Sequence, residues 1–209
     1  MHAREHVRKK VVWGWAGGAA VLALALASGP ACGPLTEAGR SGSYMMIDNL
    51  RGAPGAQPTL FGNAVQSDVL TKGSPFEDPG EVVIRLGLKD PGSPSAPNTP
   101  TLTNYITLTH YKVVYTRTDG RNTPGVDVPY PFEGGMTFTA VGGITTGTFV
   151  LVRAQAKLEQ PLRALIGLGG SLVISTTAEV TFYGHDQAGS AVSATGYITV
   201  TFADWADPA

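Results

Sequence analysis

The sequence predicts an all-β protein, an antiparallel β-sandwich of about seven or eight strands behind a leader segment. Apolar and polar residues alternate with a period of two in five separate segments, the pattern of strands that bury one face. Helical periodicity is nearly absent, and 27 Gly and 15 Pro residues fall largely between these segments, where strands would turn. Several strands that each bury one face are best explained by two sheets packed together.

The first 31 residues have the order of an export signal. A basic head (residues 4–10) precedes an uncharged apolar stretch (residues 11–28), and small residues close the segment. Such a segment enters a membrane with its basic end inside, and Pro30 ends a helix there. An uncleaved anchor helix is the alternative, because the apolar stretch approaches the roughly 17 to 25 residues that span a bilayer.

Cys32, the only cysteine of the chain, follows these small residues. The pair Ala31–Cys32 resembles the end of a bacterial lipoprotein signal, whose pattern is a branched apolar residue, a small residue, Gly or Ala, and then the lipidated Cys. Gly29 and Pro30 depart from that pattern at its first two positions. Ordinary secretory cleavage is the alternative, since Ala25 and Ala27 offer an Ala-x-Ala site and would leave Cys32 as a thiol.

The resemblance to lipoproteins implies that Cys32 carries a diacylglycerol and a third acyl chain. Several chains hold a protein on a bilayer where one chain alone is marginal. An exported domain with one cysteine forms no internal disulfide, and acylation removes an exposed thiol. Gly33 stands where an Asp would retain such a protein at the inner membrane, so the resemblance implies the outer membrane of the bacterial cell envelope.

Composition supports one exported domain after the leader. Without residues 1–31 the chain has 11 basic and 15 acidic residues, a formal charge of −4, so it carries no basic footprint for nucleic acid. Low charge with abundant Thr, Ser, Gly and Val is typical of extracellular β-proteins. The expected organisation is a signal peptide (1–31), a flexible tether (32–43) and a sandwich (44–209).

The strands are expected at residues 44–47, 64–70, 82–89, 105–118, 136–140, 150–158, 172–182 and 192–202, with one short helix or turn at 160–170. In the segment 105–118 the apolar residues first fall at even positions, Ile106 and Leu108, and then at odd positions, Tyr111 and Val113. A β-bulge near Thr109 would bring both sets to one face, and partial burial of both faces is the alternative.

The final hairpin resembles the closing strands of bacterial immunoglobulin-like repeats. Residues 182–190 (FYGHDQAGS) form an aromatic strand end with an Asp-x-Ala-Gly turn, and a Thr/Val-rich strand follows. Ser190 stands where those repeats commonly have Asn. The resemblance implies an immunoglobulin-like topology, which the order of short strands also fits, and it implies no activity.

Catalytic and metal-binding patterns are weak in the domain. His110 and His185 have no nucleophile motif beside them, and His185 and Asp186 are neighbours on a strand and so point to opposite faces. Asp119, Asn122 and Asp127 offer oxygen ligands for calcium, but Arg121 would repel the ion and Asp119-Gly120 is a turn signal. We therefore expect no enzyme, no cofactor and no metal.

Two loops suggest contact with a partner. Prolines recur every third residue in 90–103, which matches a polyproline II edge, although a plain proline-rich loop insertion that resists proteases is the favoured explanation. Tyr130 and Phe132 alternate with prolines in 123–133 and would stack on a sugar or a partner if both were exposed. The sequence thus predicts a non-catalytic structural or interaction module with a protein or glycan partner. A carbohydrate- or ligand-binding module using Tyr130 and Phe132 is the alternative.

Overall fold

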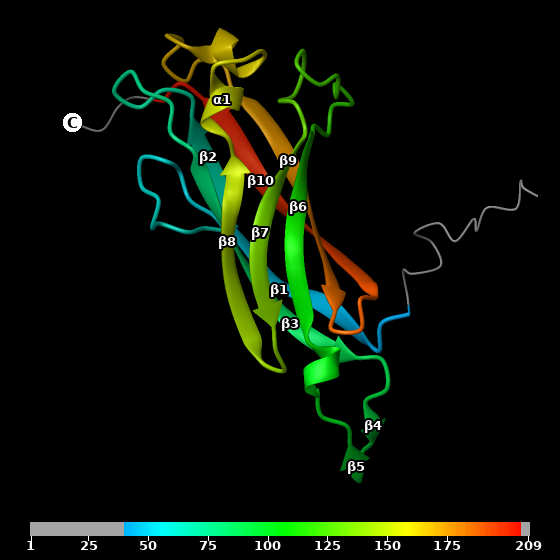
Figure 1. Ribbon diagram of the computed structural model, residues 1–209. Coiled ribbons are helices and arrows are strands. Elements are labelled where there is room, and N and C mark those ends of the chain that lie inside the picture. Colours follow the sequence, from blue (N-terminus) through cyan, green and yellow to red (C-terminus); the bar gives the residue numbers. More distant parts are fainter. Residues whose placement is uncertain (1–39, 206–209) are drawn as a thin grey trace, which may run out of the picture. The chain divides into compact units, whose positions relative to one another are not determined.

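The structure is a computed structural model that describes residues 40–205. The leader, Cys32 and most of the expected tether lie outside the described residues, as do residues 206–209. The described part is all-β, as predicted, and two sheets pack against each other (Figure 1). Its elements are β1 (Ser43–Gly52), β2 (Ala64–Asp68), β3 (Asp78–Leu88), β4 (Gly92–Ser93), β5 (Ala96–Pro97), η1 (Leu102–Asn104), β6 (Ile106–Thr116), β7 (Phe132–Ala140), β8 (Ile144–Val152), α1 (Ala154–Lys157), η2 (Leu162–Leu165), β9 (Ile174–Asp186) and β10 (Ala191–Ala203).

The sandwich has a three-stranded sheet of order β1-β3-β8 and a five-stranded sheet of order β2-β10-β9-β6-β7. In immunoglobulin lettering, β1, β3 and β8 occupy the places of strands A, B and E. Strands β10, β9, β6 and β7 then occupy those of G, F, C and C′. The described domain therefore has an immunoglobulin-like strand order.

One pairing differs from the predicted antiparallel arrangement, because β2 runs parallel to β10. Antiparallel neighbours arise from tight hairpins, whereas parallel neighbours need a longer connection. The segment 53–63 carries the chain from β1 in one sheet to β2 in the other, so β2 meets a strand from the far end of the sequence.

The core lies between the sheets and contains the predicted apolar residues of β3, whereas in β8 Phe149 and Leu151 are buried beside the predicted Val152, and the predicted Val150 is only partly buried. Val82, Ile84 and Leu86 of β3 are buried, as the alternation predicted. Aromatic rings fill the middle of the core: Phe149 of β8 contacts Tyr111 of β6 and Phe182 of β9 edge-on, with ring centroids 5.1 and 5.3 Å apart. These contacts join the two sheets.

The predicted bulge of the 105–118 strand is confirmed. The register of β6 shifts between Leu108 and His110 against both of its neighbours, β7 and β9. The extra residue lets Leu108 and Tyr111 both enter the core. Gly184 of β9 pairs with Leu108, and a Cβ atom at Gly184 would lie 2.4 Å from the Thr107 carbonyl oxygen, so the close approach at the bulge requires glycine.

Two predicted segments end differently from their expected form. The expected strand 150–158 stops at Val152, and its second half is α1. Side-chain burial inverts there, because Lys157 is buried while Leu158 is exposed. The proline-rich segment 90–103 forms a small β4–β5 hairpin followed by η1, so its prolines do not form one extended edge.

Two tyrosines of β6 cross the core to the outer strand of the opposite sheet. The Tyr111 hydroxyl accepts a hydrogen bond from the Val150 amide (3.0 Å), and the Tyr115 hydroxyl donates one to the Leu151 carbonyl (2.6 Å). Burial raises the pKa of Tyr115 far above its ordinary value. These bonds satisfy backbone groups of β8 that would otherwise be buried without a partner.

A buried ion pair at one end of the core explains why β8 ends where it does. The Lys157 ammonium of α1 donates a hydrogen bond to the Asp78 carboxylate at the start of β3 (2.9 Å), and both side chains are almost fully buried. The same carboxylate accepts hydrogen bonds from the Gly55 amide (2.7 Å) and the Ser67 hydroxyl. One carboxylate thus joins β2, β3, α1 and the segment after β1.

Burial has the largest effect on the pKa of the Asp78 carboxyl group. It raises the pKa of Asp78 above its ordinary value, although Lys157 and the hydrogen bonds from Ser67 and Gly55 act in the opposite direction. Such a pair is costly to break, because removing one partner leaves the other charge buried without compensation.

We predict that Lys157→Met and Asp78→Asn each lower the free energy of unfolding by about 3 to 5 kcal/mol, since each leaves an unpaired buried group. The double variant should cost clearly less than the sum of the two. Urea denaturation of all four proteins measures this coupling. Arg85→Gln, which breaks an exposed ion pair with Asp48, is the matched control and should cost no more than about 1 kcal/mol. If the double variant loses as much free energy of unfolding as the two single variants together, the buried ion pair between Asp78 and Lys157 is contradicted.

Candidate functional site

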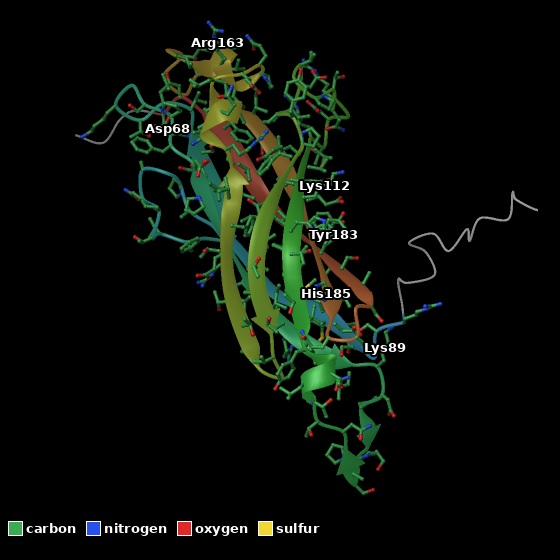
Figure 2. The ribbon with its side chains drawn as sticks, viewed as in Figure 1. Asp68, Lys89, Lys112, Arg163, Tyr183 and His185 are labelled. Atoms are coloured by element: carbon green, nitrogen blue, oxygen red, sulfur yellow. The ribbon has the colours of Figure 1, made fainter. Side chains whose placement is uncertain are left out.

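A hollow of about 500 Å³ lies at the end of the sandwich where β1 begins. Its lining includes Tyr44 of β1, Lys89 just after β3, His110 of β6, and Tyr183 and Ser193 of the two last strands. We call it the entry hollow. Figure 2 labels Lys89 and Tyr183 on the side of the domain where the described chain begins. Both sheets contribute residues, so the sequence alone does not bring these side chains together.

The bulge positions the aromatic pair of the entry hollow. Thr109 is the extra residue, and His110 beyond it pairs directly with Tyr183 of β9. Their rings stack in parallel, with centroids 4.7 Å apart and an interplanar angle of 10°. The Thr109 hydroxyl lies 2.9 Å from His110 Nδ1, which fixes the imidazole against the tyrosine.

Tyr183 lines the entry hollow between two neighbouring strands. Tyr183 pairs with His110 on one side and with Ser193 of β10 on the other. Because directly opposite side chains of neighbouring strands lie within contact distance, His110 covers one face of the ring. Ser193, on the other side, has a small side chain and also belongs to the lining.

Lys89 is a lining residue of the entry hollow, and the described residues that line it include no Asp or Glu. The backbone amide of Lys89 donates to the Gly42 carbonyl (2.9 Å), which holds this position beside the start of β1.

Strand β10, which borders the entry hollow, has two ladder partners along only part of its length. Strand β2 pairs only with residues 199–203 of β10, because β2 has five residues and β10 has 13. In the described part of the chain, residues 191–198 pair with β9 alone. On the other side of that stretch, β1 packs against β10 around Gly196 without ladder pairing among the described residues.

Asp186 secures the turn beside the entry hollow. Its Oδ1 atom accepts hydrogen bonds from the amides of Ala188 (3.0 Å) and Ser190 (2.9 Å). Burial works to raise the pKa of Asp186, but the Ser190 amide, the Ser41 hydroxyl and the Ala188 amide outweigh it and hold this pKa below its ordinary value. Asp186 is buried while His185 is exposed, so the two adjacent side chains face opposite sides.

Tyr130 and Phe132 do not form one exposed surface. Phe132 is buried in the core, where its ring meets Tyr111 edge-on and lies 4.4 Å beneath the Arg153 guanidinium carbon. Tyr130 is 51% exposed and lies against Gly125 of its own loop. The physical reason is that β7 begins at Phe132, so its first side chain turns inward with the strand.

The oxygen-rich loop 117–127 uses its carboxylates internally. Asp119 pairs with Arg117, and Asp127 pairs with Arg121 at 2.9 Å. The Arg117 guanidinium and the Arg121 amide lower the pKa of Asp119 by hydrogen bonding. Among the described residues, no group of three or more His, Cys, Asp or Glu side chains is placed to hold a metal ion.

The chain was compared with protein-family models, with curated proteins and with solved structures, and none of the three comparisons found a match. Within residues 40–205, no helix is long and apolar enough to cross a membrane.

Sequence reasoning missed Tyr183, Lys89, Tyr44 and Ser193 as site residues. The parity break at Thr109 and His110 was the one available signal, because bulges often redirect side chains at functional positions. The partners of His110 depend on strand register and on the packing of two sheets, which the alternation pattern does not encode.

We predict that Asp186→Ala lowers the free energy of unfolding by about 1 kcal/mol, because two partly buried amides lose their acceptor. Asp186→Asn keeps an oxygen acceptor and should cost less. Since the folded pKa of Asp186 lies below its unfolded value, its ionised form stabilises the domain above that value, and this contribution is lost as pH falls through the folded pKa.

Denaturation of wild type and Asp186→Asn between pH 7 and pH 2 measures this pH dependence. The difference in stability should shrink as the pH falls below the ordinary value of 3.8. A difference that stays constant across the range would show that ionised Asp186 contributes nothing to folding.

Proposed function

We propose that the protein is an exported, lipid-anchored module at the outer membrane of a bacterial cell, and that it acts by contact and not by catalysis. The single observation that carries the proposal is the order of a basic head, an apolar stretch and small residues that ends at Cys32. In this proposal the thiol of Cys32 is the site of lipid attachment.

The arrangement of the domain supports a contact role. Strand β1 begins at Ser43, eleven positions after Cys32, so a short segment would separate the anchor from the sandwich. The core is crossed by hydrogen bonds from Tyr111 and Tyr115 and closed at one end by the Lys157–Asp78 pair. A core joined in this way holds loops and hollows at fixed positions, which suits recognition of a partner.

We predict that cells fed an alkyne-bearing palmitate label the wild-type protein and do not label Cys32→Ser, because the acceptor thiol is gone. Gel fluorescence after coupling to a dye, with the intact mass of the purified protein, measures the incorporation. The matched control is Cys32→Ser combined with Thr36→Cys, which moves the thiol four positions away from the leader. It should stay unlabelled.

Two outcomes would contradict the lipid anchor. An unlabelled wild-type protein whose mass begins at residue 28 would support ordinary secretory cleavage after Ala27. Equal labelling of the relocated thiol at position 36 would show acylation of any accessible cysteine, independent of the leader pattern.

A further inference from the structure

We propose that Lys157 and Asp78 become covalently joined, and that their buried ion pair is the precursor of an isopeptide bond. The side-chain nitrogen of Lys157 replaces one oxygen of the Asp78 carboxyl group, and one water molecule is released. This modification site goes beyond the proposed function and does not depend on lipid attachment at Cys32.

The position of the two groups provides the first argument. The Lys157 nitrogen lies 2.9 Å from Asp78 Oδ1, and therefore lies next to the carboxyl carbon that carries this oxygen. The lysine is held by α1 and the aspartate by the first position of β3. Groups fixed in contact react as if they were at very high concentration, because folding has already removed their freedom to move apart.

Burial provides the second argument. The side chains of Lys157 and Asp78 are 1% and 0% exposed. Surroundings without water disfavour both charged forms, and burial raises the pKa of Asp78. Transfer of one proton along the hydrogen bond, from the nitrogen to Oδ1, gives a neutral amine beside a neutral carboxylic acid. The neutral amine is a nucleophile, and the carboxylic acid has a hydroxyl as its leaving group.

The other hydrogen bonds of Asp78 give its two oxygens different roles. Oδ2 accepts the Ser67 hydroxyl, whereas Oδ1 accepts the Gly55 amide together with Lys157. Attack of the nitrogen on the carboxyl carbon moves negative charge to Oδ2, where the Ser67 hydroxyl stabilises it. The Oδ1 hydroxyl takes one more proton from the nitrogen and leaves as water. One C–N bond forms and one C–O bond breaks, so the step needs no co-reactant.

The bond gives the domain a covalent link that its cysteine content does not allow. The chain has one cysteine, so it forms no internal disulfide. An amide between Asp78 and Lys157 closes a loop that runs from the start of β3 to α1. Closing this loop restricts the unfolded chain, which stabilises the folded domain.

Tryptic mapping of the denatured full-length protein tests the bond directly. Without the bond, trypsin cleaves after Lys157 and releases residues 154–157 and residues 73–85 as separate peptides. With the bond, trypsin does not cleave at the acylated lysine, and residues 154–163 stay joined to residues 73–85. We expect this joined peptide, at a mass one water molecule below the sum of its two parts. Tandem mass spectrometry places the link at Asp78 and Lys157.

Acid cleavage provides a second measurement, because Asp78 precedes Pro79 and Asp90 precedes Pro91. Dilute acid breaks an Asp–Pro bond when the free aspartate side chain attacks its own backbone carbonyl. An aspartate held as an amide lacks this reactivity. In the denatured protein we expect cleavage between Asp90 and Pro91, which is the control within the same molecule, and protection between Asp78 and Pro79.

Two variants assign the nucleophile. Lys157→Arg should abolish the joined peptide and restore acid cleavage after Asp78, because a guanidinium group keeps its charge and has no free amine. Lys112→Arg is the matched control, since Lys112 forms an exposed ion pair with Glu133 at 3.6 Å. It should keep the joined peptide at the wild-type level.

The proposal is overturned if wild-type protein yields separate peptides 154–157 and 73–85 and is cleaved equally at the two Asp–Pro bonds, because the pair is then ionic only. It is also overturned if residues 73–85 are joined to a different peptide, or if the link persists in Lys157→Arg. The wild-type measurements decide the question even if Lys157→Arg fails to fold, and palmitate labelling at Cys32 has no effect on them.

Discussion

The buried contact between Lys157 and Asp78 is the constraint on which one end of this sandwich depends. A charge in the core requires an opposite charge and further hydrogen bonds, because burial without them costs several kcal/mol. Asp78 meets this need with Lys157, Ser67 and Gly55, and so fixes the start of β3 against β2 and α1. The chain leaves β8 at Val152 and turns through α1, which brings the ammonium group inward.

At the opposite end of the sandwich, the bulge of β6 determines which side chains enter the core and where His110 lies. One extra residue at Thr109 lets β6 bury Leu108 on one side of the break and Tyr111 on the other. It also places His110 against Tyr183, which gives the entry hollow its stacked rings. The close approach of β6 and β9 here is possible only because Gly184 has no side chain. Core packing and the candidate site therefore share one structural cause.

The entry hollow lies beside the start of β1, and both sheets contribute residues to it. The short β2 strand pairs only with residues 199–203 of β10, so among the described residues 191–198 have β9 as their one ladder partner.

The sequence by itself determined the all-β class, the buried parity of β3 and the break in β6, because side-chain alternation records which face of a strand meets apolar surroundings. It misassigned residues 153–158, where Lys157 occupies a position that the alternation gave to solvent. Only the tertiary structure decided that β2 runs parallel to β10, that Phe132 is buried and that Lys89 shares a hollow with Tyr183. These features depend on contacts between residues far apart in the chain, and local patterns carry no record of such contacts.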